Sequence, residues 1–88
     1  MTLYEELNNA LERVCRINIR FMGDQQHADE LTENVSGPLE RLRIGQASRR
    51  DMGVLCASGI VHEANLFGAN IPNVIDEMIE KMKAEVQY

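Results

Sequence analysis

Apolar side chains recur through residues 3–22 at alternating steps of four and three, and no Gly or Pro interrupts the segment. That spacing lays a single seam along a helix, made by Leu3, Leu7, Ala10, Val14, Ile17 and Phe21. A second row flanks the seam, so the apolar arc spans roughly 200°, and this row is Leu11, Cys15, Ile19 and Met22. One neighbouring helix cannot cover so wide an arc. The pattern predicts a long helix that meets more than one partner surface.

Capping residues mark where two of the expected helices begin. Thr2 stands three residues before Glu5, and Ser48 stands three residues before Asp51. In each pair the two side chains can satisfy each other's free backbone N–H groups at a helix N-terminus. We therefore expect one helix over residues 3–22, closed by Gly23, and another over residues 49–67.

The last helix is predicted over residues 71–86, with Asn70 as its cap and Pro72 in its first turn. Its apolar residues form a stripe narrow enough for an amphipathic helix laid on a core, namely Ile71, Val74, Ile75, Met78, Ile79, Met82 and Val86. We expect this stripe to cover the seam of the first helix.

The segment between Asp24 and Ile44 is more polar and predicts one or two short helices. Ser36, Gly37 and Pro38 are expected to separate them, because proline interrupts a helix interior. The buried side chains are predicted to be Ala28, Leu31 and Val35 before the interruption and Leu39, Leu42 and Ile44 after it.

Two glycines lie inside the helix expected over residues 49–67, and each lowers helix stability by about 1 kcal/mol relative to Ala. Close approach of another helix at Gly53 and Gly59 is one explanation. A bend at Gly59 is the other, and the sequence leaves both open.

The fold class that follows is all-α, with three main helices and one or two short ones in a single domain over residues 1–88. The 88 residues include no Trp, two Phe, two Tyr and five Met, a palette that suits helix packing better than a sheet sandwich. A chain of this size buries only about 60–65% of its unfolded surface. Oligomerisation is therefore an expected supplement to the core.

Charge and composition exclude several partner classes. The net charge of −5 disfavours general binding to nucleic acid or to an anionic membrane. No apolar run has the length of a membrane span, and the N-terminus lacks the pattern of a secretory signal. We expect a cytoplasmic protein whose Cys15 and Cys56 are free buried thiols, although a single disulfide between them stays open.

The function that we predict is that of a small protein-interaction or regulatory module that works as a homo-oligomer, with a dimer favoured. The predicted interface consists of the apolar residues of the first helix, Leu3, Leu7, Leu11, Val14, Cys15, Ile17, Ile19, Phe21 and Met22. An acidic protein partner is expected to meet the exposed arginines Arg13, Arg16, Arg20, Arg41, Arg43, Arg49 and Arg50. Pairing of the last four with acids of the C-terminal half is the competing interpretation.

A DNA-binding regulator is the alternative function, with a divergent helix-turn-helix near residues 60–78. Gly68 and Asn70 fit the turn and the cap of that motif, but Asp76 and Glu77 would face the phosphates and repel them.

An enzyme is the less expected class. His27 lies near Asp24, Glu30 and Glu33, the raw material of a metal-dependent hydrolase site, yet a polar helix produces such sets by chance. We predict no catalytic residue, no metal and no cofactor.

Overall fold

The computed structural model describes the backbone of residues 1–86 and the side chains of residues 1–85. Across this part of the chain the regular structure is entirely helical, which confirms the all-α prediction. Five helices follow one another: α1 (Leu3–Arg20), α2 (Gln25–Arg43), α3 (Arg49–Ala57), α4 (Ile60–Leu66) and α5 (Ile75–Val86).

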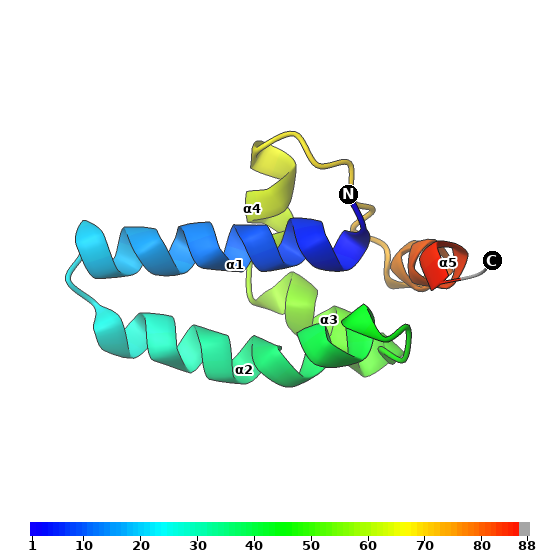
Figure 1. Ribbon diagram of the computed structural model, residues 1–88, viewed down its shortest axis with the longest axis horizontal. Coiled ribbons are helices and arrows are strands. Elements are labelled where there is room, and N and C mark those ends of the chain that lie inside the picture. Colours follow the sequence, from blue (N-terminus) through cyan, green and yellow to red (C-terminus); the bar gives the residue numbers. More distant parts are fainter. Residues whose placement is uncertain (87–88) are drawn as a thin grey trace.

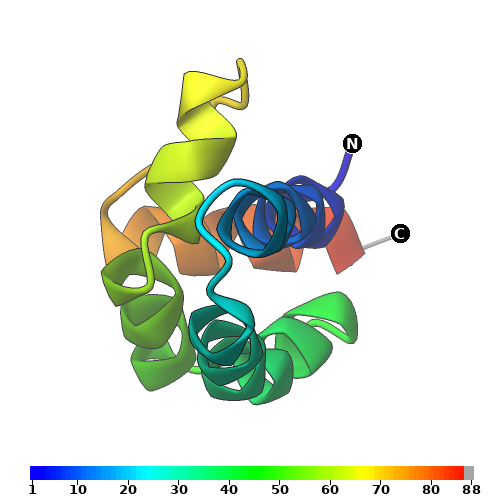
Figure 2. The same cartoon turned by 90° about the vertical axis from the view of Figure 1, so that its left-hand side faces the viewer.

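Helices α1 and α2 form an antiparallel pair that sets the long dimension of the molecule. Figure 1 shows them side by side, with the loop that joins them projecting beyond α3 and α4. Seen along the pair in Figure 2, α3 and α4 lie on one side of it, and α5 crosses behind at the end near the N-terminus. The principal extents are 42 × 24 × 21 Å, because the pair is longer than the cluster packed against it.

The core lies between the N-terminal half of α1, the C-terminal half of α2 and the three remaining helices. Its fully buried side chains include Leu3 and Leu7 of α1, Met52 and Leu55 of α3, and Met78 of α5. Helix α1 packs most extensively on α2, next on α4 and only slightly on α5. The expectation that the last helix covers the seam of the first is therefore wrong, since α2 and α4 do so.

Helix ends carry the interactions that the capping residues predict. Thr2 with Glu5 and Ser48 with Asp51 both form complete capping boxes. Helix α1 gains a second cap from the far end of the chain, because the carboxylate oxygens of Glu85 accept from the backbone N–H of Leu3 at 2.8 and 3.1 Å. A negative charge at this end also complements the helix dipole.

An ion pair between the half-exposed Arg41 and the buried Asp51 joins α2 to α3. Arg41 donates from Nε and Nη2 to the two carboxylate oxygens of Asp51, both at 2.8 Å. The guanidinium, together with the Ser48 backbone, lowers the pKa of Asp51 to about 2. This pair fixes where the chain re-enters the core after the loop of residues 44–48.

The predicted interruption at Ser36–Pro38 is wrong, because α2 continues through Pro38 to Arg43. The apolar residues Ala28, Leu31, Val35, Leu39 and Leu42 keep one helical spacing across the proline. Burial of Val35, Leu39 and Leu42 in the core outweighs the hydrogen bond that proline removes. Ile44, which the two-helix prediction placed inside, is 51% exposed just after the helix ends.

The helix expected over residues 49–67 is two helices, α3 and α4, which meet at Gly59. This glycine has φ of +88°, a left-handed conformation that glycine adopts without strain. A Cβ at Gly53 would make only an ordinary contact, 3.8 Å from Ile75 Cδ1. The bend at Gly59, rather than close packing of another helix, is thus what the structure contains.

Helix α5 begins at Ile75, four residues later than predicted, and Asn70 is not its cap. Asn65 at the end of α4 holds the intervening backbone, since its side chain donates to the carbonyl of Ile71 and accepts from its N–H at 3.0 and 2.9 Å. Pro72 also disfavours a helical conformation for Ile71. Of the predicted apolar stripe, the side chain of Val86 lies outside the described residues.

Candidate protein-interaction surface

The apolar seam of α1 is buried at one end of the helix and exposed at the other. Leu3, Leu7 and Ala10 are fully buried. Val14 is half-buried, Ile17 is 44% exposed and Phe21 is 81% exposed, although all three continue the same seam. Helix α4 crosses α1 at a steep angle in Figure 1 and contacts it at Arg13, and the change in exposure follows this crossing.

The protruding part of the α1–α2 pair, residues 13–34, is called the arm below. Its outer end extends beyond α3 and α4 in Figure 1. Val14, Ile17 and Phe21 continue the seam of Leu7 and Ala10, and the half-buried Leu31 lines a groove with Val54 of α3. Val14, Ile17, Phe21 and Leu31 form the open face of the arm, on the side of α3 and α4.

A groove of about 430 Å³ lies at the base of the arm. Leu31 and Asn34 of α2 line one side of it, and Val54, Ala57 and Ser58 line the other. The open face therefore ends in a concave, largely apolar seat.

The structure divides the predicted interface residues into three groups. Leu3, Leu7 and Leu11 belong to the core of the single chain. Val14 and Cys15 are half-buried, and the Cys15 thiol lies 3.4 Å from Thr32 Oγ1 on α2. The remaining four stay on the surface, with exposed fractions of 44% for Ile17, 43% for Ile19, 81% for Phe21 and 69% for Met22.

Charge is segregated between the two helices of the arm. Residues 13–22 hold three arginines and no acidic residue, whereas residues 24–34 hold four acidic residues and no Lys or Arg. Within residues 1–85, the one ion pair that involves the arm joins Arg13 to Glu63 of α4, and no ion pair links α1 to α2. The arm thus has a basic helix and an acidic helix whose charges do not pair with each other.

Four of the seven predicted contact arginines pair with acids of their own chain. Arg13 lies 3.6 Å from Glu63, while Arg41 pairs with Asp51, Arg43 with Glu40 and Arg49 with Asp76. Two of these acids, Asp51 and Glu63, come from residues 51–66, and a third, Asp76, lies on α5. Among the described residues, Arg16, Arg20 and Arg50 are exposed without an ion-pair partner.

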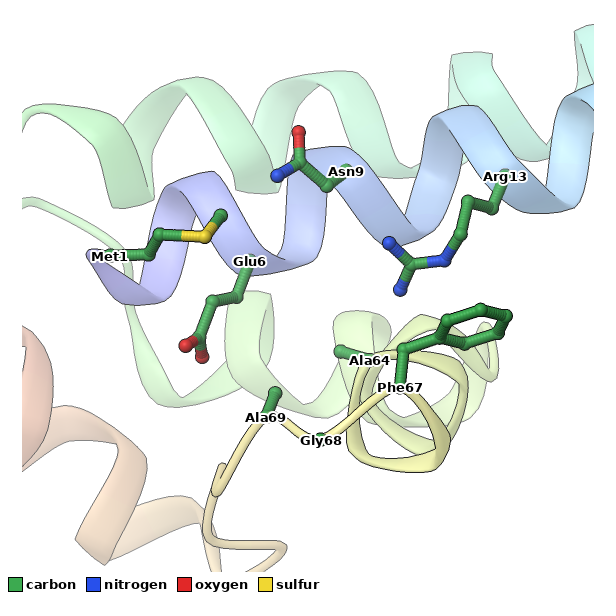
Figure 3. Close-up of a pocket in the computed structure, with 8 residues that line it drawn as sticks. All are labelled: Met1, Glu6, Asn9, Arg13, Ala64, Phe67, Gly68 and Ala69. Atoms are coloured by element: carbon green, nitrogen blue, oxygen red, sulfur yellow. The ribbon is translucent and has the colours of Figure 1, made fainter.

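A second hollow, of about 230 Å³, lies between α1 and the end of α4 (Figure 3). The Arg13 guanidinium lies over the ring of Phe67, 4.2 Å from its centroid, and the Glu6 carboxylate extends toward the hollow from an earlier turn of α1. Arg13 Nε and Glu63 Oε1 are buried without a hydrogen bond of their own. These contacts dock α4 on α1 and end the covered part of the seam.

The described residues offer few candidates for a catalytic site. They contain no group of three or more His, Cys, Asp or Glu side chains placed to hold a metal ion. Asp24 accepts from the backbone N–H of His27 at 3.0 Å and acts as the cap of α2. Burial raises the pKa of the Cys56 thiol, which lowers its nucleophilic fraction at neutral pH.

The geometry near residues 60–78 departs from a helix-turn-helix. Residues 67–74 separate α4 from α5, whereas that motif joins its helices by about three to four residues. Asp76 and Glu77 are exposed at the start of α5, where a recognition helix would meet phosphates.

The sequence did not indicate that four apolar residues lie at the surface, namely Leu66, Phe67 and the groove residues Val54 and Ala57. Leu66 and Phe67 are each 66% exposed, because the bend at Gly59 turns α4 away from an enclosed position. The left-handed preference of Gly59 was the only available signal.

No protein-family model matches the chain, and neither a curated protein nor a solved structure is detectably similar to it. Among the residues that the structure describes, none of the helices combines the length and the apolar character needed to cross a membrane.

Proposed function

We propose that this protein is a self-associating interaction module and that the open face of the arm is its working surface. The observation that carries the proposal is the continuity of the α1 seam. Side chains of the same spacing are fully buried at Leu7 and Ala10 and are 44% and 81% exposed at Ile17 and Phe21. The exposed part of such a seam is removed from water when another apolar surface packs on it.

A second copy of the chain is the partner that we propose for this face. The arm carries both charge signs, one on each helix, so α1 of one copy and α2 of another are opposite in charge. The small core of an 88-residue chain also gains from the added burial.

Sedimentation equilibrium of the wild-type chain and of an Ile17→Glu variant tests this function. We expect a wild-type mass of two chains at micromolar concentration and a mass of one chain for the variant, because a buried carboxylate would oppose the contact. Arg50→Glu, a charge change on an exposed residue of α3, is the matched control and keeps the dimer.

A wild-type chain that stays monomeric over the whole concentration range contradicts the proposal. So does a dimer that Ile17→Glu leaves intact, because the contact would then lie elsewhere. The helical circular dichroism of the variant should match that of the wild type, since Ile17 lies outside the core.

A further inference from the structure

Two sulfur atoms from different helices meet at the edge of the core. The thiol of Cys56 on α3 donates to the thioether Sδ of Met78 on α5, and the two sulfur atoms are 3.5 Å apart. Cys56 is half-buried, and the side chain of Met78 is fully buried. The thiol proton therefore lies between two soft, polarisable atoms.

An imidazole from a third helix reaches the same place. Cys56 and His62 of α4 both line a cavity of about 130 Å³, whose other walls are Val61, Asn65 and Asn73. A cavity of this size has room for an ion or a few water molecules but is smaller than the pockets that hold organic ligands. His62 is exposed, so an ion can enter from solvent on its side.

The donor set, two sulfur atoms and one ring nitrogen, selects the kind of ion. Thiolate and thioether ligands favour Cu(I), whereas Mg²⁺ and Ca²⁺ prefer oxygen ligands. Among the described residues that line the cavity, none is Asp or Glu. Structural zinc sites take four ligands from Cys, His, Asp and Glu, and the described residues contain no group of even three such side chains placed to hold a metal. The set fits a soft monovalent cation.

We propose that Cys56, Met78 and His62 form a Cu(I) site where α3, α4 and α5 meet. The ion takes the place of the thiol proton between the two sulfur atoms, and the neutral imidazole donates a ring nitrogen from the cavity. As the Cu–S bond forms, the thiol proton leaves to water. The half-buried site therefore gains no net charge, which avoids the cost of burying an unpaired ion. Residue spacing gives no sign of this site, because its ligands come from three helices.

Nuclear magnetic resonance of the methionine methyl groups tests the site in the wild-type chain. Ag(I) is the probe, because it shares the ligand preference of Cu(I) and is stable to oxidation. We expect the methyl signal of Met78 to show the largest shift and to reach its final position at one equivalent, while the buried Met52 and Met82 keep theirs. A Met78 signal that does not move overturns the site, because the metal would then be bound without the thioether.

Matched substitutions of two buried methionines of α5 test the affinity. Met78→Leu removes the thioether with little change in volume, and Met82→Leu is the same change outside the site. Anaerobic competition for Cu(I) with a chromogenic chelator measures the dissociation constant. Losing an outer-shell partner of a metal ligand already costs about 10–100-fold in affinity, so Met78→Leu should raise the constant at least about tenfold. Met82→Leu should leave it unchanged.

Further variants test the thiol and the imidazole. Cys56→Ala should abolish the one-equivalent binding, whereas Cys15→Ser should retain it, because the Cys15 thiol contacts oxygen atoms of Ala28 and Thr32. His62→Gln should weaken binding by a smaller factor than Met78→Leu. Circular dichroism checks the helicity of every variant.

Wild-type affinity in Met78→Leu overturns the site, and so does binding that Cys15→Ser abolishes. An unchanged constant in His62→Gln contradicts the three-ligand set. None of the three ligands belongs to residues 13–34, so these results leave the self-association proposed above to its own test.

Discussion

The two halves of α1 carry one apolar seam and have different surroundings. In the first half, Leu3, Leu7 and Ala10 are enclosed by α2, α4 and their neighbours. In the second half, Ile17 and Phe21 repeat the same spacing and are 44% and 81% exposed. The comparison shows that periodicity specifies which side of a helix is apolar, whereas the length and direction of the neighbours decide how much of it is covered.

Helix α4 covers the first half of the α1 seam but not the second half. It begins at the bend of Gly59, ends at Leu66, and docks on α1 through Glu63 and Phe67 at the level of Arg13. Beyond Arg13 the arm has only two helices. A two-helix arm with an apolar side is the expected form of a surface that another protein completes.

A matched pair of side-chain truncations, one in each half of α1, should give the largest difference in the free energy of unfolding. Leu7→Ala should lower the free energy of unfolding by about 3 kcal/mol, because it leaves a cavity in the core. Phe21→Ala should change it by less than about 0.5 kcal/mol in dilute, monomeric protein, because that side chain is exposed. Urea denaturation at low protein concentration measures both. Equal losses would show that the second half of α1 is covered within the chain.

A smaller effect is expected from the ion pair that holds the covered side together. Asp51→Asn should lower the free energy of unfolding by about 2 kcal/mol at neutral pH, since it weakens the bidentate contact with Arg41 and the cap at Ser48.

The pH dependence of that effect has a definite sign. The folded pKa of Asp51 is about 2, below its ordinary value of 3.8. Its stabilising contribution is therefore complete above the ordinary value and is lost as the pH falls toward 2. The stability difference between wild type and Asp51→Asn should shrink over that interval, as followed by urea unfolding at a series of pH values. A difference that stays constant down to pH 2 contradicts the role of the carboxylate.

The smallest effects concern the bend that limits α4. Gly59→Ala should cost about 1 kcal/mol, because φ is +88° there and an L residue adopts this region with strain. Gly53→Ala, inside α3, should instead stabilise by about 0.5 kcal/mol, because its Cβ would find ordinary contact distance. Thermal unfolding of the two variants should give shifts of opposite sign. Stabilisation by both would mean that Gly59 is not required at the bend.

Much of the fold could be predicted from local chemistry. Both capping boxes and the starts of α1 and α3 follow from the spacing of Thr2 with Glu5 and of Ser48 with Asp51. These interactions involve residues three apart, so the sequence contains all the information. The all-helical class follows in the same way from apolar spacing.

The errors arose where distant contacts override local preference. Pro38 lies inside α2 because the core holds the residues on both sides of it, and α5 starts late because Asn65 fixes the backbone of Ile71. The ion pair between Arg13 and Glu63 depends on how α4 folds back after Gly59. None of these contacts has a signature in residue spacing.

The candidate surface was predicted only in part for the same reason. The spacing correctly placed Ile17 and Phe21 on an apolar side, but it could not tell them from Leu3 and Leu7, which the chain covers itself. The groove residues Val54 and Ala57 come from another helix and were not expected at the surface.

Amide hydrogen exchange as a function of protein concentration tests the central claim most directly, because it reports which segment a partner copy covers. The account predicts that, as concentration rises through the dissociation constant, protection increases in the arm, residues 13–34, and at the groove residues of α3, while α5 is unchanged. Protection that does not depend on concentration, or that rises in α5 and not in the arm, would contradict it.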